Sequence, residues 1–465
     1  NIYQTTYVGG TPDTYKVTVK FYRDCDGISA PGSLNLNYSS ASCGVNQSIT
    51  LSRIGSGTII TPICPTMNST CTGGNVIGIE EYTYEATINI SKCPDWIFSV
   101  QECCRNNAIS TINAPGQEEL RIEAPLNNLT LCNNSPSFTQ NPVPYICANT
   151  PYCYNNGAVE PDGDSLVYSL ITPLTGGGSV VYNNGYSVNN PVGGTTTFNY
   201  LTGNLCMNPP SPLTSVVAIK VEEYRNGVLI GSIIRDIQVN VLNCTEPPPY
   251  LTGIDTLAAV DSDPTGSIST YSLCTDGNTT INFNIGALTN STVTNLNMSW
   301  NNAIPSASFS VSNNSTPNPV GVFSWTPSLL DVANSPYYFV VTVIDDACPL
   351  MSTFSYAYQI NLNYSSGSYI KSDVSCFGYQ DGTIDLSVIG GYPPYNYYWL
   401  DSVSGFTSNL EDLSNLDQGH YYCFITDSIG DTLGCGLEPI DVIIDEPSIL
   451  AVTSTFSEVS CYSAN

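Results

Sequence analysis

Residues 375–399 carry the pattern that decides the fold, and they read SCFGYQDGTIDLSVIGGYPPYNYYW. Apolar side chains alternate with polar ones from Thr383 to Val388, and a Gly-Gly-Tyr-Pro-Pro run separates this segment from the aromatic run that ends at Trp399. Alternation with a period of two, bounded by glycine and proline, is typical of β-strands joined by turns. The stretch therefore predicts two strands of a half-buried sheet.

The sequence around Cys376 occurs a second time near the end of the chain. Asp-Val-Ser-Cys-Phe-Gly at 373–378 is echoed by Glu-Val-Ser-Cys-Tyr-Ser at 458–463, 85 residues further on. A fixed period of this length is the signature of a tandem array. We therefore expect one complete module, the first strand of the next, and a longer polypeptide that continues with further copies.

Residues 375–450 resemble the SprB-type repeat of Bacteroidetes cell-surface proteins that are linked to gliding motility. The shared features are, in order, a cysteine, Asp-Gly, Gly-Gly-x-Pro-Pro-Tyr, Gly-x-Tyr and Gly-Cys. Asp417, Gly419, Tyr421 and Cys423 also resemble the D-x-G-x-Y-x-C of immunoglobulin domains, in which the tyrosine bonds back to the turn before its strand. Both resemblances imply a β-sandwich.

The rest of the chain also shows strand and turn signals. Arg-Asn-Gly at 225–227 predicts a tight hairpin, and Glu-Pro-Pro-Pro at 246–249 predicts a stiff linker. EPDGDSLVYSL at 160–170 and FSWTP at 323–327 resemble bacterial cadherin-like or immunoglobulin-like domains, and Trp325 is expected in a core. YKVTVKFYRDCDGI and WIFSVQECCRNNAIST resemble the N-terminal domain of large secreted Bacteroidetes proteins.

We expect an all-β chain of tandem immunoglobulin-like or cadherin-like β-sandwiches, stapled by disulfides into an elongated array. The expected segments are a cysteine-rich N-terminal β domain at 1–133, a cadherin-like sandwich at 134–246, an immunoglobulin-like sandwich at 247–365, the SprB-type repeat at 366–449, and the start of the next repeat at 450–465.

The charge of the chain limits its partners. The 465 residues include 11 basic and 39 acidic side chains, for a formal net charge of −28. This charge repels phosphate backbones and anionic lipid headgroups, so nucleic acid is excluded as a partner. No apolar run approaches the roughly 18 residues of a membrane-spanning helix, so membrane insertion is not expected either.

The cysteines point to an oxidising compartment. There are 18 of them beside a single histidine, and none forms a C-x-x-C pair followed by histidine ligands, so disulfides are favoured over zinc. The chain begins at Asn1 rather than methionine, which is consistent with removal of a secretion signal. We therefore expect an extracellular protein of the cell surface.

Several cysteine pairings are expected. Cys461 begins a truncated copy, so its partner should lie beyond residue 465. Cys423 alternates with Tyr421 and should be a buried free thiol. The remaining 16 cysteines would form eight disulfides, which include Cys376 with Cys435, Cys274 with Cys348, Cys147 with Cys244, Cys153 with Cys206, and Cys64 with Cys71. The immunoglobulin resemblance implies Cys376 with Cys423 instead.

Two further kinds of site are expected at turns. Glu160, Asp162 and Asp164 alternate around Gly163, so their oxygens are candidates for one calcium ion, although a plain Pro-Asp-Gly turn explains the same letters. Asp-Ser/Thr-aliphatic triplets resemble the O-glycosylation acceptor of Bacteroidetes. They place candidate acceptors at Ser165, Thr256, Ser402, Ser428 and Thr432.

Catalysis within this chain is not expected. His420 is the only histidine, and alternation places it opposite to Tyr421, towards solvent, so a nucleophile activated by histidine has no base. No glycine-rich phosphate loop opens a helix. Apart from calcium, no cofactor is expected.

The expected function is that of a secreted surface adhesin or filament, whose repeated weak contacts sum to high avidity. The resemblance implies export by type IX secretion and a link to gliding. Expected partners are an extracellular surface or polysaccharide, the outer-membrane secretion or gliding machinery, and further copies in a fibre. Two alternatives stay open: a soluble carbohydrate-binding protein, which would show exposed aromatic side chains on one face, and the accessory β-domains of a secreted enzyme.

Overall fold

Strands and three short 3-10 helices are the regular elements among the residues that this computed structural model describes. It describes residues 2–9, 13–142, 145–244, 246–255, 270–275, 277–291, 294–390, 393–401, 403–426 and 439–456. The chain divides into two compact units. The first comprises Asn1–Tyr271, Ile281–Trp325 and Tyr337–Ile360, and the second comprises Ser272–Thr280, Thr326–Pro336 and Asn361–Asn465. The expected all-β class is confirmed.

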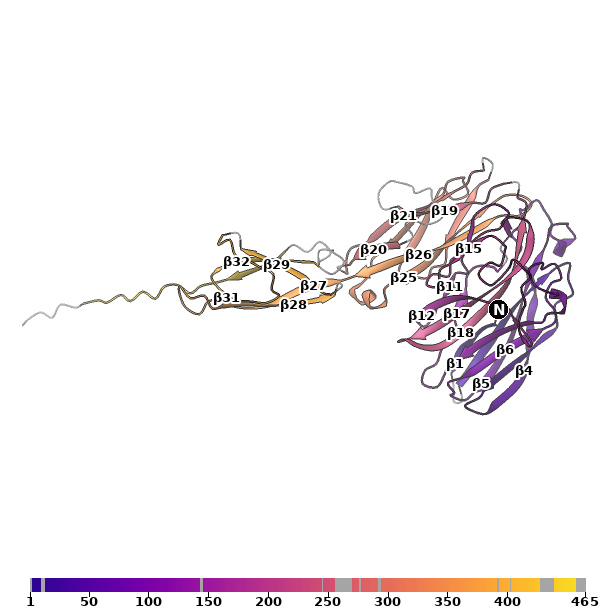
Figure 1. Cartoon of the computed structure of the whole chain (residues 1–465), viewed down its shortest axis with the longest axis horizontal. Helices are drawn as coiled ribbons and strands as arrows, with labels where there is room; N and C mark the ends of the chain where they lie inside the picture. The colour runs from indigo at the N-terminus through magenta and orange to yellow at the C-terminus, as the bar shows by residue number, and fades with distance from the viewer. Residues whose placement is uncertain are drawn as a thin grey trace, which may run out of the picture. The chain divides into compact units, whose positions relative to one another are not determined.

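A large sheet dominates the first unit (Figure 1). Its main path runs β1-β2-β5-β4-β3-β6-β7-β18-β17-β12. The side chains of Tyr15, Val17 and Val19 in β2 are buried while the residues between them are half-buried, which is the alternation that makes this segment a strand. The bounds are β1 (Ile2–Gly9), β2 (Asp13–Asp24), β3 (Ser33–Ser40), β4 (Val45–Ile59), β5 (Ile79–Ile90), β6 (Trp96–Glu102), β7 (Leu120–Leu126), β12 (Ser165–Ile171), β17 (Leu213–Arg225) and β18 (Val228–Leu242).

The sheet continues across the domain boundary expected at residue 133. Leu126 of β7 is paired with Gly231 of β18, and the Asn127 backbone N–H donates to the Ile230 carbonyl at 2.7 Å. The hairpin of β17 and β18 turns at Asn226 and Gly227, which both have positive φ, as the Asn-Gly signal predicted. The first two expected segments therefore share one sheet, because backbone pairing continues from one to the other.

Shorter elements complete this part of the unit. β10, β16 and β15 form a three-stranded sheet, β11 pairs with β8, and β9, β13 and β14 join the large sheet. The bounds are β8 (Ser137–Phe138), β9 (Tyr145–Cys147), β10 (Tyr152–Tyr154), β11 (Ala158–Val159), β13 (Leu174–Thr175), β14 (Gly178–Ser179), β15 (Thr195–Phe198), β16 (Leu205–Asn208), η1 (Thr70–Thr72) and η2 (Pro115–Gln117).

Two four-stranded sheets follow in the chain, ordered β19-β21-β24-β23 and β20-β26-β25-β22. Their buried aromatic side chains pack together, since the rings of Phe283, Phe323 and Phe339 are stacked with centroids 4.8 to 6.2 Å apart. Trp325 is buried, as expected for a core residue. The bounds are β19 (Tyr250–Asp255), β20 (Thr270–Cys274), β21 (Ile281–Leu288), β22 (Leu296–Trp300), β23 (Ser308–Ser312), β24 (Val320–Trp325), β25 (Tyr337–Asp345), β26 (Thr353–Asn363) and η3 (Leu329–Asn334).

The second unit contains a seven-stranded sandwich. One sheet is ordered β27-β28-β31 and the other β30-β29-β32-β33, and Figure 1 shows β28 and β31 along one side and β29 and β32 along the other. A three-plus-four division of seven consecutive strands is the immunoglobulin-like arrangement. The bounds are β27 (Ser365–Ser372), β28 (Gly382–Gly390), β29 (Asn396–Asp401), β30 (Thr407–Ser408), β31 (Leu413–Leu416), β32 (Gly419–Thr426) and β33 (Ile440–Ile444).

Local pattern explains this sandwich. The two strands predicted from residues 375–399 are β28 and β29, and the alternating Ile384 and Leu386 meet Trp399 in one core cluster. The Tyr421 hydroxyl donates to the Asp417 carbonyl at 2.9 Å, which is the bond back to the turn that the resemblance implied. The Trp399 indole N–H donates to the Leu410 carbonyl at 3.0 Å, so this buried ring has its polar atom satisfied.

Candidate functional sites

Cys64 is bonded to Cys348, a residue 284 positions away in the sequence. Both expected pairings that involved these two cysteines, Cys64 with Cys71 and Cys274 with Cys348, are therefore wrong. The Cys64 backbone N–H donates to the Pro349 carbonyl at 3.2 Å, and Ile63 forms a β-bridge with Leu350. This antiparallel contact brings the two cysteines together. Of Cys274, only the backbone is described.

Two other pairings agree with expectation. Cys147 is bonded to Cys244, and Cys153 to Cys206. Strand pairing explains the second, since Cys153 and Cys206 are direct partners in the antiparallel pair of β10 and β16. Three further disulfides are Cys25 with Cys71, Cys43 with Cys93, and Cys103 with Cys104, and of these six cysteines only Cys71 had been given an expected partner.

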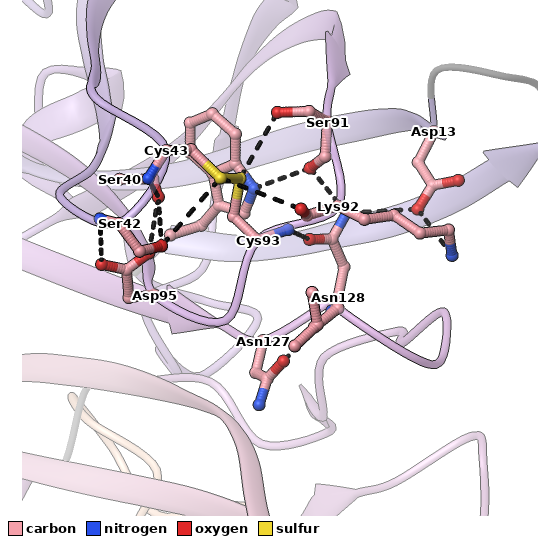
Figure 2. The surroundings of a disulfide bond; sticks show 12 residues. Asp13, Ser40, Ser42, Cys43, Ser91, Lys92, Cys93, Asp95, Asn127 and Asn128 are labelled. Carbon is pink, nitrogen blue, oxygen red and sulfur yellow. Dashed lines mark hydrogen bonds and ion pairs between the residues drawn. A yellow bond between two sulfur atoms is a disulfide. The ribbon is translucent and has the colours of Figure 1, made fainter.

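The bond between Cys43 and Cys93 lies beside a hydrogen-bonded turn (Figure 2). The Asp95 carboxylate accepts the hydroxyls of Ser40 and Ser42 at 2.5 Å each, and the Ser42 backbone N–H at 2.9 Å. These hydrogen bonds, the one from Ser40 foremost, lower the pKa of Asp95 to about 2. The site therefore has a structural role, because these polar groups form hydrogen bonds with one another and the disulfide links the two segments.

The cysteines of the repeat differ from those of the first unit. Cys423 is free and buried, as expected, and burial raises the pKa of its thiol to about 12. The immunoglobulin-type pair of Cys376 with Cys423 is therefore not formed. Cys376 is also free, and it is exposed, so its expected bond to Cys435 is not formed either. Cys435 and Cys461 themselves lie outside the described residues. Cys132 is a further free cysteine that parity had assigned to a disulfide.

The three acids proposed for calcium do converge. Glu160, Asp162 and Asp164 each offer an oxygen within 4.8 Å of the others. Most of these oxygens already accept hydrogen bonds: Asp162 binds the backbone N–H and the side-chain amide of Asn134 at 2.7 and 2.8 Å, and Glu160 accepts the Asp164 backbone N–H at 2.7 Å. The loop is therefore a closed turn around Gly163, whose φ is +84°.

A guanidinium group lies against this turn. Arg225 donates from Nε to Asp164 Oδ1 and from Nη2 to Asp164 Oδ2, both at 2.6 Å, and its Nη2 lies 3.4 Å from Asp162 Oδ2. A calcium ion needs six to eight oxygen ligands. Arg225 occupies both carboxylate oxygens of Asp164, and its positive charge would repel a calcium ion. The residues present therefore do not fit calcium while Arg225 holds this position.

Glu223 is a fourth acid of the same neighbourhood. Its side chain is 1% exposed, its Oε2 accepts the Asn133 amide at 2.6 Å, and its Oε1 is buried with no hydrogen-bond partner. Burial raises the pKa of Glu223 to about 8, and the nearby charges of Glu160, Asp164 and Asp162 add to the rise. Sequence reasoning missed this residue, since the strand pattern gives no sign that a glutamate is enclosed.

The candidate acceptors for O-glycans can be located at one position only. Ser165 is the first residue of β12 and is exposed, so its hydroxyl is accessible. Thr256, Ser402, Ser428 and Thr432 lie outside the described residues. Glycosylation at all five stays a prediction.

The single histidine lies on the surface of the repeat. His420 Nδ1 is 3.8 Å from Asp441 Oδ1, and both side chains are about half exposed. In the part of the chain that the structure describes, no serine or cysteine nucleophile contacts His420. The arrangement is that of two exposed side chains on the paired strands β32 and β33.

Aromatic and aliphatic side chains cover the outer surface of the sheet that contains His420. Tyr398 lies opposite Phe424 and Leu400 opposite Tyr422 in the pairing of β29 with β32, and Ile443 follows on β33. Tyr398, Phe424 and Ile443 are 49%, 41% and 43% exposed. We call these five residues the aromatic face. It is the feature expected of the carbohydrate-binding alternative.

The comparisons identify the repeat. Residues 368–404 match the family described as the SprB repeat, and this segment runs from within β27 to just beyond β29. The segment is therefore a SprB-type repeat, and the match supports an adhesin-like role at a cell surface. None of the curated proteins matches this chain. Among the described residues, no helix has the length and hydrophobicity to cross a membrane.

Three solved structures are similar at low identity. The mouse nectin-like molecule 4 ectodomain is 10% identical, with a TM-score of 0.20 over 67% of this chain and 100% of that one. Eight immunoglobulin domains of Down syndrome cell adhesion molecule are 11% identical (TM-score 0.27; 93% of this chain, 58% of that one). The protocadherin GammaB4 extracellular domain is 10% identical (TM-score 0.21; 90% and 63%). This chain thus spans less than two thirds of the length of the last two.

Proposed function

We propose that this chain is part of a secreted bacterial surface adhesin that attaches through many weak contacts. The observation that carries the proposal is the SprB-type repeat matched at 368–404, which supplies strands to the immunoglobulin-like sandwich of β27 to β33 and whose first motif occurs again 85 residues later. When several domains each make a weak contact, the overall binding strength rises, because the second contact forms at a high local concentration once the first has formed.

Disulfides support an extracellular location for this adhesin. Six are present among the described residues of the first unit, and cytosolic conditions would keep most of these thiols reduced. The finer assignments rest on the resemblance: export by the type IX route, a link to gliding motility, and association of chains into fibres. Extracellular surfaces and polysaccharides are the partners that we propose.

Attachment under flow tests the proposal. Microspheres coated with the full chain at graded density would be passed over glass, agarose and a bacterial capsule film. Retention should rise much more steeply than linearly with coating density, since several contacts must hold together. Spheres coated with bovine serum albumin at the same densities are the control. If retention on every surface equals that of the control at all densities, the chain is no adhesin.

A soluble carbohydrate-binding role is the second candidate, and the aromatic face favours it. The two candidates differ in how binding depends on valency. A soluble binder would bind its polysaccharide with the same affinity whether the chain is free or displayed at high density. An adhesin would bind strongly only when many chains are displayed together.

A further inference from the structure

The strands that carry the aromatic face present two distinct surfaces. Alternation sends Trp399, Tyr421 and Cys423 into the core cluster and leaves Tyr398, Tyr422 and Phe424 on the outer surface. Both of the exposed rings in this group, Tyr398 and Phe424, are directly paired across strands. The neighbouring aromatic residues of the outer surface are thus a product of the same pattern that builds the core.

The charges on this surface favour some partners over others. The segments of β29, β32 and β33 contain no lysine or arginine, and the ionisable groups that they expose beside the rings are His420 and Asp441. The whole chain carries a formal charge of −28. Anionic polymers are therefore disfavoured as partners of this surface.

The size of the aromatic face also argues against a protein partner. A large aromatic side chain offers about 150–250 Å² in total, so three rings at half exposure or less offer roughly 300 Å². Stable protein interfaces bury about 600 Å² or more on each partner. The face is small for a dimer and ample for a few sugar rings.

The spacing of the side chains suits a polymer of rings. Paired side chains on neighbouring strands are separated by about 5 Å, and residues two apart on one strand by about 7 Å. The electron-rich face of an aromatic ring attracts the C–H groups of a sugar. His420 and Asp441 offer a donor and acceptors to hydroxyl groups at the border of the rings.

From these observations we infer that the aromatic face binds an uncharged polysaccharide, with sugar rings packed on Tyr398, Tyr422 and Phe424. The inference rests on the proposed function and adds to it a ligand class and a site. One contact per repeat would be weak, and an array would multiply it.

Affinity electrophoresis of the full chain tests the inference. The probes are hydroxyethylcellulose, soluble starch, galactomannan and dextran, with hyaluronate as the anionic control. At least one neutral polymer should retard the native chain, and hyaluronate should not. The double variant Tyr398→Ala/Phe424→Ala should bind at least about tenfold more weakly, since it loses two ring contacts.

The matched control is Tyr369→Ala/Tyr379→Ala, which removes two tyrosines of the same repeat that are 42% and 58% exposed and lie off the aromatic face. It should bind as the native chain does. Tryptophan fluorescence and thermal unfolding check that both variants fold.

Three results would overturn the inference: no retardation by any neutral polymer, equal weakening in both variants, or a concentration-dependent dimer that only the Tyr398/Phe424 variant abolishes. Adhesion of coated spheres separates this failure from that of the proposed function. If spheres adhere equally with and without Tyr398 and Phe424, the aromatic face is not the binding site, and the proposed adhesin function is unaffected. Spheres that never adhere would refute the adhesin.

Discussion

Arg225 donates two parallel hydrogen bonds of 2.6 Å to the Asp164 carboxylate, from Nε to Oδ1 and from Nη2 to Oδ2. The two residues lie at the ends of two paired strands: Asp164 directly precedes β12, and Arg225 is the last residue of β17. A bidentate pair of this kind combines charge with fixed geometry. It supplies the positive charge that three converging carboxylates require.

Removing Arg225 should create a calcium response that the native chain lacks. Millimolar calcium or chelator should leave thermal unfolding of the native chain unchanged. In Arg225→Gln, calcium should raise the unfolding temperature, because both oxygens of Asp164 lose the guanidinium group and can bind the ion beside Glu160 and Asp162. Arg225→Lys keeps the charge and should stay unresponsive. A calcium-dependent shift in the native chain would contradict the role given to Arg225.

Glu223 should make the first unit less stable as pH rises. Its folded pKa is raised to about 8 from 4.5, chiefly by burial, so the folded state holds its proton more tightly than the unfolded state does. The unfolding free energy is therefore highest below pH 4.5 and falls as pH rises from there to about 8. Urea unfolding measured at intervals of pH should show this decline.

Glu223→Gln should remove most of that decline. The amide keeps the shape and loses the charge, so we expect a gain on the order of 1–3 kcal/mol at pH 8 and almost none at pH 4.5. Glu222→Gln is the control, because Glu222 lies on the partly exposed surface in an ion pair with Lys220. An unchanged pH profile in Glu223→Gln would show that other groups cause the slope.

Cys423 should be unreactive in the folded chain. Only the thiolate is nucleophilic, and burial raises the pKa of this thiol to about 12. In mass mapping after maleimide treatment, the peptide with Cys423 should be unlabelled from native chain and labelled from chain in guanidinium. Cys423→Val should preserve the fold better than Cys423→Ser, whose hydroxyl would be buried among apolar side chains. Rapid native labelling would contradict the burial.

Digestion without reduction should release the peptide of Cys64 joined to that of Cys348. Replacing both by serine should cost about 2–5 kcal/mol, as loss of a native disulfide does. Cys64 linked to Cys71, or Cys348 to Cys274, would restore the pairing that sequence reasoning favoured and remove the long-range bond.

Local pattern was sufficient for the repeat, where alternation, turn residues and the Tyr421 corner lie within 85 residues of sequence. It failed where residues far apart in the sequence meet. The pairing of β7 with β18, the partner of Cys64 and the bond of Arg225 to Asp164 all join residues 61 or more positions apart. The sequence showed the acidic turn at Glu160, Asp162 and Asp164, but it did not show that Arg225 neutralises this turn. The Arg-Asn-Gly signal predicts a hairpin and says nothing about where the arginine side chain lies.

The bond from Cys64 to Cys348 has a consequence for a chain under tension. A pull between the two ends of the chain passes through this bond and through the bond from Cys25 to Cys71, so residues 72–347 lie outside the load path while both are intact. An adhesin stretched by flow would then keep most of its first unit folded at forces that open the rest.

Single-molecule stretching would measure this protection. Cys64→Ser/Cys348→Ser should lengthen the unravelled chain by roughly 500–600 Å, since the stretches from Cys93 to Cys147 and from Cys244 to Cys348 become extensible. Cys153→Ser/Cys206→Ser should add nothing, because that loop is enclosed by two other disulfides. The covalent link thus decides how much of the molecule bears a load at all.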